Sequence, residues 1–327
     1  MRRPDFWQNG GLVANILTPL GWVFHGAGQI RQWMARPYRA PIPVICVGNL
    51  VAGGAGKTPV AMALADMLIA AGLKPHFLTR GYGGNLSGPV QVDPTQHKVV
   101  AVGDEALLLA EIGPCWVARN RADGARAAVE AGADVIVMDD GLQNPQLAKD
   151  LSFIVIDGAV GFGNGRVIPA GPLRKTLTTG VARAHAAILI GMDTSNAESA
   201  LGGRLPVLNA RFVPAPGMSS LEGRAVVAFA GIGRPEKFFA SLLEAGCDLK
   251  DMHDFPDHHV FAPDEIGAIL EQAAALGATA MTTAKDAVRL PVDARNLVEV
   301  FHVALEWDAP DDIIALINKA VAKQADA

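Results

Sequence analysis

The sequence is poor in cysteine and in aromatic residues, and it has no excess of basic residues. Cys46, Cys115 and Cys247 show no paired spacing, so the sequence predicts neither a disulfide framework nor a zinc site, and it fits a reducing compartment. The net charge of −5 at pH 7 gives the chain no basic field of the kind that attracts nucleic acid. Nucleic acid is therefore not an expected partner.

No hydrophobic run is long enough to cross a bilayer. The apolar run at residues 11–24 contains Asn15, Thr18 and Pro19 and spans 14 residues, whereas a membrane-spanning helix needs about 18–20. Residues 1–40 also contain five arginines, one acidic residue and three of the five tryptophans. This composition is typical of a helix that lies at the lipid headgroup boundary. A core helix that packs on the first domain is the alternative interpretation.

The most informative motif lies in residues 44–59, where a short predicted strand runs into a glycine-rich turn and a predicted helix begins near Thr58. The turn closes on Gly56, Lys57 and Thr58. Its backbone N–H groups can hold nucleotide phosphates, with Lys57 reaching the β/γ oxygens and Thr58 reaching Mg²⁺. The strict P-loop pattern has glycine where this chain has Val51, so an ordinary glycine-rich turn is the alternative. The predicted nucleotide-binding residues are Val51, Ala52, Gly53, Gly54, Ala55, Gly56, Lys57 and Thr58.

Predicted strands alternate with predicted helices along the chain, and several of the strands are continuous apolar runs. This pattern predicts an α/β fold with mainly parallel sheets that carry helices on both faces. The length of 327 residues suggests about two domains.

Two adjacent carboxylates, Asp139 and Asp140, follow the predicted strand at residues 134–138. Because a side chain at the carboxyl end of a parallel strand faces the ligand crevice, both are predicted to hold Mg²⁺. Asp-Asp-Gly is also a favourable turn sequence, and a turn is the alternative.

Four further residues could carry chemistry, and spacing alone leaves each open. Asp104 lies at an N-cap-like position of a predicted helix. Arg174 lies in a loop, where it could clamp an anion or face solvent. His258 and His259 are adjacent, and one of them could act as an acid or base.

Nine segments stand out together, in order along the chain. They are residues 47–59, 79–83, 103–105, 139–143, 163–165, 169–174, 229–236, 255–259 and 282–288. In this combination the sequence resembles the tetraacyldisaccharide 4′-kinase family, the lipid A 4′-kinases of Gram-negative bacteria.

The resemblance implies two P-loop-like α/β domains with the active site between them, and an N-terminal hydrophobic helix that meets the membrane. The implied reaction uses ATP and Mg²⁺ and transfers the γ-phosphate to the 4′-hydroxyl of a tetraacylated glucosamine disaccharide 1-phosphate, which gives lipid IVA. The implied location is the cytoplasmic face of the inner membrane. The expected partners are the membrane-embedded lipid A precursor and anionic inner-membrane lipids.

Composition and the order of predicted elements divide the chain, and the resemblance assigns roles to its residues. The expected parts are an interfacial segment at residues 1–40, a P-loop kinase domain at 41–205, a connection at 206–221 and a smaller α/β domain at 222–327. Asp104 is the implied base, oriented by His258. Lys57, Asp139 and Asp140 complete the implied catalytic set, and the implied substrate-binding residues are Asn49, Arg80 and Arg174.

The chain departs from the family pattern at three positions. It has Asn144 where the family usually has histidine, and Lys175 and Ala284 where the family usually has glutamate. No family role is therefore transferred to residues 175 and 284.

Two rival functions share the same loop class. A membrane-associated P-loop switch ATPase usually carries an extra lysine just before the glycine pair, where this chain has Ala52. A soluble small-molecule ligase would not need the basic, tryptophan-rich N-terminal segment. ATP turnover measured with and without a lipid acceptor separates all three.

Overall fold

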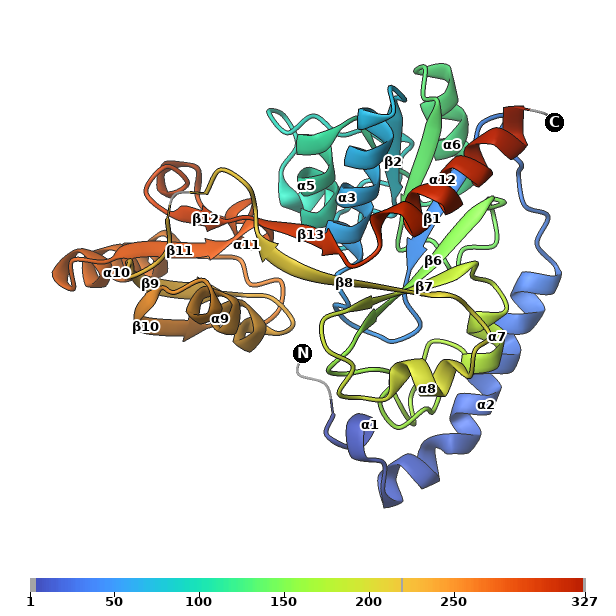
Figure 1. Cartoon of the computed structure of the whole chain (residues 1–327), viewed down its shortest axis with the longest axis horizontal. Helices are drawn as coiled ribbons and strands as arrows, with labels where there is room; N and C mark the ends of the chain where they lie inside the picture. Colours follow the sequence, from blue (N-terminus) through green and yellow to red (C-terminus); the bar gives the residue numbers. More distant parts are fainter. Residues whose placement is uncertain (1–3, 219, 326–327) are drawn as a thin grey trace. The chain divides into compact units, whose positions relative to one another are not determined.

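A computed structural model describes residues 4–218 and 220–325, which form two compact units (Figure 1). The larger unit comprises residues 4–211 and 305–325, and the smaller unit comprises residues 212–304 in its described part. The chain passes between the units twice, within β8 (Val207–Pro214) and within β13 (Val303–Trp307).

The larger unit is built on a nine-stranded sheet with the order β13-β8-β7-β6-β1-β5-β2-β4-β3. The pairings from β8 across to β4 are parallel, and β3 is antiparallel to β4. The remaining strands of this sheet are β1 (Val44–Gly48), β2 (Pro75–Thr79), β3 (Val90–Gln91), β4 (Cys115–Val117), β5 (Val135–Asp139), β6 (Leu151–Asp157) and β7 (Ala186–Ile190). Since β1, β5, β6 and β7 are buried along their whole length, most of their residues are apolar.

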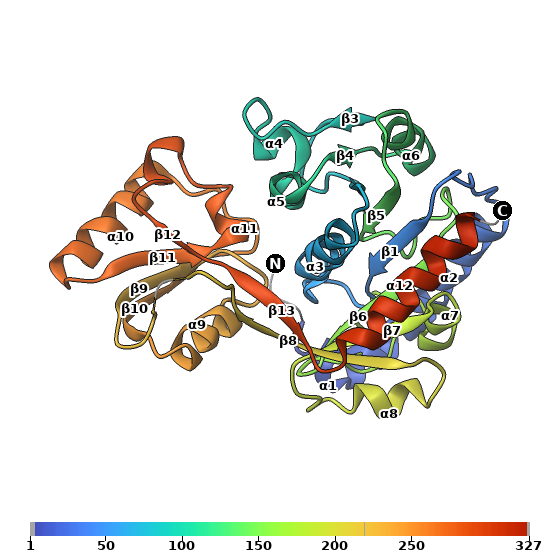
Figure 2. The same cartoon turned by 45° about the horizontal axis from the view of Figure 1, so that its top comes forward.

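Helices cover both faces of this sheet (Figure 2). Successive side chains of a strand point to opposite faces, so Val44 and Cys46 join one apolar cluster together with alanines of α6 and residues of α7 and α8. On the other face α3 packs on β1 and β5, α5 packs on β2 and β4, and α12 packs on β6. The helices are α3 (Lys57–Ala70), α4 (Val99–Val102), α5 (Asp104–Ile112), α6 (Arg121–Glu130), α7 (Leu177–Val181), α8 (Ala197–Leu201) and α12 (Pro310–Ala325).

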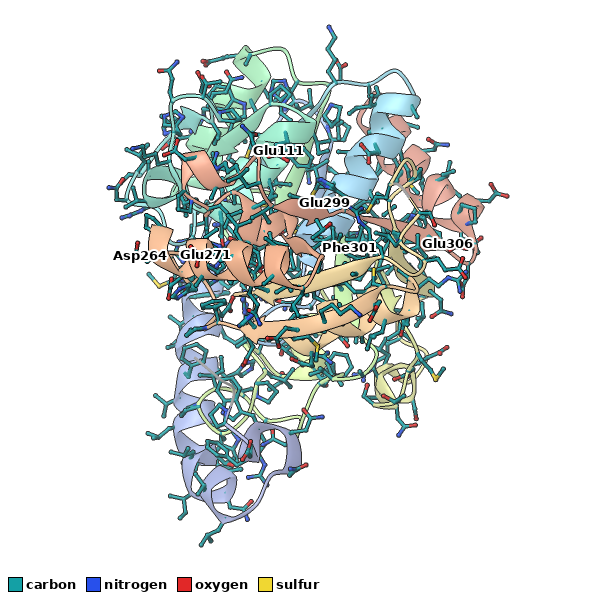
Figure 3. All side chains as sticks on the ribbon, turned by 90° about the vertical axis from the view of Figure 1, so that its left-hand side faces the viewer. Glu111, Asp264, Glu271, Glu299, Phe301 and Glu306 are labelled. Atoms are coloured by element: carbon teal, nitrogen blue, oxygen red, sulfur yellow. The ribbon has the colours of Figure 1, made fainter. Side chains whose placement is uncertain are left out.

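The smaller unit has a four-stranded parallel sheet with the order β10-β9-β11-β12. Two apolar clusters lie on its two faces, one around Phe229 and Phe261 and the other around Phe238 and Phe301. Figure 3 shows Phe301 and Glu299 on β12, and Glu299 accepts a hydrogen bond from Arg224. The elements are β9 (Ala225–Ala230), α9 (Pro235–Glu244), β10 (Asp248–Asp254), α10 (Pro263–Ala275), β11 (Thr279–Thr283), α11 (Ala284–Ala287), a 3₁₀ turn (Val292–Ala294) and β12 (Glu299–Phe301).

The predicted α/β class with mainly parallel sheets is confirmed. The units differ from the expected domain bounds at two places. Residues 305–325 return to the larger unit, where α12 packs on β6, and β8 belongs to the nine-stranded sheet instead of a free connection. Hydrophobic pattern alone could not assign α12 to one of two sheets, because an amphipathic helix fits either.

The N-terminal segment begins with α1 (Phe6–Asn9), followed by the long helix α2 (Leu12–Trp33). The large apolar side chains of α2 point outward: Trp22 is 69% exposed, Val23 71% and Trp33 87%. Side chains project freely from the outer side of α2 in Figure 3. Within the described ranges no helix is both long enough and apolar enough to cross a membrane. Arg2 and Arg3 of the predicted interfacial segment lie outside the described residues.

Small and polar residues of α2 face the rest of the unit. Ala14 and Gly21 are its buried residues, and Thr18, on the same face, accepts a 2.7 Å hydrogen bond from Arg166. A Cβ atom on Gly21 would lie 2.9 Å from the backbone oxygen of Val167. The helix therefore lies close to the unit through residues without bulk, while its bulky face remains exposed.

Gly21→Ala should lower the midpoint of thermal unfolding, although alanine normally stabilises a helix interior by about 0.5–1 kcal/mol relative to glycine. The added methyl group must displace a backbone oxygen, at a cost of about 1–3 kcal/mol. Gly28→Ala is the matched control, because nothing lies within 4 Å of its added Cβ, and it should raise the midpoint. Equal shifts of the midpoint in the two variants would show that α2 does not pack on the loop that contains Val167.

Candidate functional site

The ends of two adjacent parallel strands define the candidate site. Val47 of β1 is in register with Asp139 of β5, so the segments that follow both strands leave the sheet at the same edge. A Cβ atom on Gly48 would lie 2.5 Å from the Cβ of Leu142. Only glycine allows this approach, which brings the loop after β1 against the loop after β5.

The loop from residue 49 to residue 56 is held open by hydrogen bonds at its base. Asn49, which is fully buried, donates from Nδ2 to the Gly53 oxygen at 3.1 Å. Gln143 donates to the Asn49 oxygen at 2.7 Å. Gly56 has a φ of 83° and is the N-cap of α3. Within the described structure, the N–H groups of residues 53–58 donate no hydrogen bond, so they are available to an anion at the positive end of α3.

A second chain segment pairs with the start of this loop. The Ala52 N–H donates to the Pro172 oxygen at 2.8 Å, and the Arg174 N–H donates to the Leu50 oxygen at 2.8 Å. The Ala52 N–H is thus engaged within the protein, unlike those of residues 53–58. This pairing also brings Arg174 to the site.

Asp140 lies between two cations. Arg174 donates to both of its carboxylate oxygens, at 2.9 and 3.0 Å. Lys57 is 3.9 Å from the Asp140 Oδ1. Burial acts to raise the pKa of Asp140, but Lys57 and Arg174 outweigh it, so the pKa of Asp140 lies below its ordinary value. Asp140 is therefore ionised and accepts from one terminal nitrogen of Arg174 with both oxygens, while Lys57 is held more loosely.

Asp139 has the opposite electrostatic character. It is 2% exposed, and its Oδ2 accepts a 2.9 Å hydrogen bond from the Thr58 hydroxyl. Its Oδ1 is buried and has no hydrogen-bond partner among the described residues. Burial, reinforced by the charges of Glu105 and Asp140, raises the pKa of Asp139 to about 6, although Lys57 acts to lower it.

An unpartnered carboxylate oxygen beside a threonine hydroxyl is a donor set that suits Mg²⁺. No group of three or more His, Cys, Asp or Glu side chains in the described ranges could hold a metal by itself. A nucleotide-bound Mg²⁺ does not need one, because it takes one or two protein ligands and completes its shell with phosphate oxygens and water. Thr58 and Asp139 therefore fit the ion expected from the sequence, whereas both carboxylate oxygens of Asp140, the third predicted ligand, accept from Arg174.

Asp104 and Arg80 come from neighbouring elements of the same unit. Asp104 is 1% exposed and is the first residue of α5, whereas Gly103, with a φ of 87°, takes the N-cap position that the sequence suggested for the aspartate. Arg80 is exposed after β2. Burial is the main cause that lowers the pKa of Arg121 to about 10, and the charge of Arg80 is the next cause. Arg80 therefore lies on the same side of the unit as Arg121.

Arg121 is a site residue that the sequence analysis missed. It is 3% exposed, donates to the Ala118 oxygen, and lies near enough to Asp139 and Asp140 for their charges to raise its pKa against the effect of burial. A cation at the first residue of α6 is disfavoured by the helix dipole. That mismatch is the sequence signal that could have identified it.

His258 belongs to the smaller unit and lies in a braced loop. Its φ is 61°, unusual for a residue other than glycine, and its N–H donates to the Gly231 oxygen at 3.0 Å. Gly231 in turn donates to Asp286 at 2.9 Å, and Arg289 donates to the Gly231 and His259 oxygens at 3.0 and 3.1 Å. Asp286 and Arg289 form a buried ion pair. The loop around His258 is therefore fixed by buried charges in its own unit.

Comparison with known proteins gives the family. A family model described as tetraacyldisaccharide-1-P 4′-kinase matches residues 13–322. The chain belongs to this family. A tetraacyldisaccharide 4′-kinase of Paramagnetospirillum magneticum is 55% identical over 320 residues, 98% of each chain. The corresponding enzyme of Rhodospirillum rubrum is 53% identical over 327 residues, also 98% of each chain.

A solved structure agrees with this membership. The crystal structure of the "apo" form of LpxK from Aquifex aeolicus in complex with ATP has a TM-score of 0.78 to this chain, at 25% identity. The match covers 95% of this chain and all of that one. The resemblance inferred from the nine sequence segments is thereby confirmed.

The structure shows the surroundings of the three residues that depart from the family pattern. Asn144 donates to the Gln146 side chain at 3.1 Å and accepts from its N–H at 2.9 Å. Ala284 is the first residue of α11, after the capping Thr283. Lys175, next to Arg174, is 7% exposed and donates to Gln32 of α2.

Asp139→Asn should stabilise the protein in EDTA at pH 8 while removing most kinase activity. The substitution removes a charge that burial penalises, because a carboxyl group whose folded pKa is raised to about 6 costs stability above that pH. The gain in free energy of unfolding should shrink as the pH is lowered from about 8 toward about 4, where the wild-type carboxyl is itself protonated in the folded state.

Asp150→Asn is the control for this prediction. Asp150 accepts from the Val44 N–H at 2.9 Å and pairs with Arg39 at 3.2 Å, so the loss of its charge should bring no gain at any pH. A stability decrease in Asp139→Asn at pH 8 would show that the ionised carboxylate is structural.

Proposed function

We propose that this chain transfers the γ-phosphate of ATP to the 4′-hydroxyl of a tetraacylated glucosamine disaccharide 1-phosphate, which forms lipid IVA in lipid A biosynthesis. The observation that carries the proposal is the family match over residues 13–322. The open N–H groups at the start of α3, with Lys57 and Arg174 beside them, agree with it.

Phosphoryl transfer mainly requires the reactants to be positioned and negative charge to be neutralised. The N–H groups of residues 53–58 would bind the ATP phosphates. Lys57 lies 3.9 Å from its carboxylate neighbour, a long contact that leaves its ammonium group free to turn toward the β/γ oxygens. Arg174 keeps a fixed orientation on Asp140 and would add a second positive charge.

Thr58 and Asp139 would hold Mg²⁺, with the ionised Asp140 beside them as the third predicted ligand. The bound ion would supply charge neutralisation for the transferred phosphate. The buried Oδ1 of Asp139 and the raised pKa of this carboxyl group are both expected for a residue whose charge is balanced by a cation.

Asp104 would take the proton of the sugar hydroxyl, with His258 as the residue that orients and polarises it. A hydroxyl group is a weak nucleophile at neutral pH, and a positioned base contributes about 10²–10⁴-fold to the rate. Asp104 is buried in the larger unit, and His258 lies in a braced, positive-φ loop of the smaller unit, so each residue has a defined backbone conformation within its own unit.

The enzyme would work at the cytoplasmic face of the inner membrane, where its acceptor lies. The outward apolar face of α2 would enter the headgroup region, and anionic lipids would attract the basic residues near it, among them Arg31, Arg36 and Arg39. A helix that exposes Trp22, Val23 and Trp33 needs an apolar surface to cover them.

A kinase assay tests the proposed reaction. Wild-type protein with [γ-³²P]ATP and the tetraacylated disaccharide 1-phosphate in mixed micelles should give a labelled lipid with a second phosphate. Lys57→Ala should lower the rate by about 10²–10³-fold, because it removes a charge from the developing phosphoryl group. Lys74→Ala, at an exposed lysine of the same unit, is the control and should keep wild-type activity.

ATP hydrolysis that proceeds at full rate without the lipid, with no labelled lipid in its presence, would support a switch ATPase and refute the kinase. Full transfer by a folded Lys57→Ala variant would refute the nucleotide site.

A double-mutant cycle tests the Asp104 and His258 pair. If the two side chains act as one unit, Asp104→Ala, His258→Ala and the double variant should lose similar amounts of kcat. His253→Ala is the control histidine, since it lies in the smaller unit and contacts Gln272 at 2.8 Å. Its effect should be small and should multiply with that of Asp104→Ala. Multiplicative losses for Asp104 and His258 would show that they do not cooperate.

A further inference from the structure

Three basic side chains meet beneath α2, on the side opposite its exposed apolar face. We call His25, Lys175 and Arg183 the cationic cluster. Lys175 donates to Gln32 of α2, and Arg183 donates to Gln29 of α2 at 3.4 Å. His25 precedes Gln29 by one helical turn, so all three lie along one side of the helix.

The cluster carries positive charge without an acidic partner among the described residues. Across the described part of the chain, neither Lys175 nor Arg183 forms an ion pair, and their hydrogen-bond partners on α2 are uncharged amides. Burial, followed by the charges of Arg183, Arg31 and Lys149, lowers the pKa of Lys175 to about 8. The pKa of His25 is likewise lowered, by burial and then by Lys175 and Arg183. The positive charges of Lys175 and Arg183 therefore repel each other in a region with little exposure to solvent.

Two polar atoms of the cluster also lack partners. The Nδ1 atom of His25 and one terminal nitrogen of Arg183 are buried, and neither has a hydrogen-bond partner among the described residues. Lys175 is only 7% exposed. Buried charges in proteins are normally paired, and a buried unsatisfied donor costs about 1–3 kcal/mol. An anion placed among these three groups would remove both the repulsion and the missing hydrogen bonds.

We infer that the cationic cluster binds a phosphate group, and that the headgroup of an anionic membrane phospholipid supplies it. Arginine and lysine are the side chains that hold phosphate oxygens. The phospholipid source follows from α2, and it rests on the membrane placement proposed above. The cluster lies under a helix that exposes Trp22 and Trp33, so a lipid whose chains contact that face would bring its headgroup to the edge of the helix.

Positive charge continues from the cluster to the exposed end of α2. Arg31, in the last turn of α2, is exposed and still acts on the pKa of Lys175, so positive charge extends from the surface to the buried lysine. Lys175 also directly follows Arg174, which holds Asp140 at the nucleotide site. A bound phosphate would therefore fix the chain one residue away from a proposed ATP contact.

Vesicle binding by the full chain tests the site without using kinase activity. The vesicles contain phosphatidylcholine with phosphatidylglycerol or, at the same surface charge, with oleate, and they contain no disaccharide acceptor. Lys175→Gln/Arg183→Gln should bind the phosphatidylglycerol vesicles about 10- to 30-fold more weakly than wild type. Its binding to the oleate vesicles should fall much less.

Arg126→Gln/Arg204→Gln is the matched control, because it removes the same net charge from the larger unit at α6 and beside α8. It should bind both kinds of vesicle like wild type. Equal losses in the two double variants would attribute binding to overall charge and overturn the site.

Thermal unfolding in saturating ATP and Mg²⁺, which occupy the nucleotide site, gives a second readout. Inorganic phosphate, compared with chloride at equal ionic strength, should raise the midpoint of wild type and not that of Lys175→Gln/Arg183→Gln. In phosphate-free buffer this variant should be at least as stable as wild type, because the substitution relieves like-charge repulsion. A clear loss of stability there would show that the cations are structural and would overturn the inference.

The two readouts also separate the sources of the phosphate. A phosphate-dependent rise in the midpoint with unchanged vesicle binding would overturn the phospholipid assignment in favour of a soluble phosphate. Cluster-dependent vesicle binding that appears only after the disaccharide 1-phosphate is added would overturn it in favour of the acceptor's own phosphate. The vesicles contain no disaccharide acceptor. A failure of the kinase assay would therefore not change the interpretation of the vesicle-binding result.

Discussion

The parallel pairing of β1 with β5 is the constraint on which the larger unit's site depends. It sets Val47 against Asp139, and from that register the glycine loop and the two aspartates leave the sheet together. The contact of Gly48 with Leu142 then permits no side chain between the two loops. A shift of the register by one residue would turn Asp139 to the opposite face of the sheet and separate it from Thr58.

Charge in this unit is incompletely paired at the places where we propose that the nucleotide, its metal ion and a lipid phosphate bind. Asp140 is ionised and holds Arg174, whereas Asp139 is buried with one oxygen unpartnered. Beneath α2, Lys175 and Arg183 have no acidic partner within the described residues. Such arrangements cost stability in the free protein, and proteins retain them where binding needs them. The nucleotide, its metal ion and a lipid phosphate are the charges that would complete them.

Helix α2 reverses the usual distribution of side chains in a surface helix. Its buried residues are Ala14 and Gly21, and its tryptophans face outward. The small residues allow a close approach to the loop that contains Val167. Gln29 and Gln32 accept hydrogen bonds from Arg183 and Lys175 of the cluster. The same helix therefore links an apolar outer surface to the chain segment that carries Arg174, and through that segment to the loop after β1.

The sequence by itself determined the fold class, the family and the nucleotide loop. These follow from local patterns: buried parallel strands are continuous apolar runs, and the glycines with Lys57 and Thr58 carry their chemistry within a few residues. The place of Asp139 and Asp140 in the site could also be predicted, because side chains at the carboxyl end of a parallel strand face the ligand crevice. The outward direction of the α2 apolar face could be inferred only as one of two alternatives.

Only the tertiary structure decided which distant residues meet. The pairing of residues 50–52 with 172–174 brings Arg174 to Asp140, the fold buries Arg121 near both aspartates, and α12 returns to the larger sheet. The contact of Lys175 with α2 was equally beyond the sequence pattern. The physical reason is that such contacts depend on strand order and on the path of loops between elements. Periodicity and composition describe each element alone, and they carry no information about which other element it will touch.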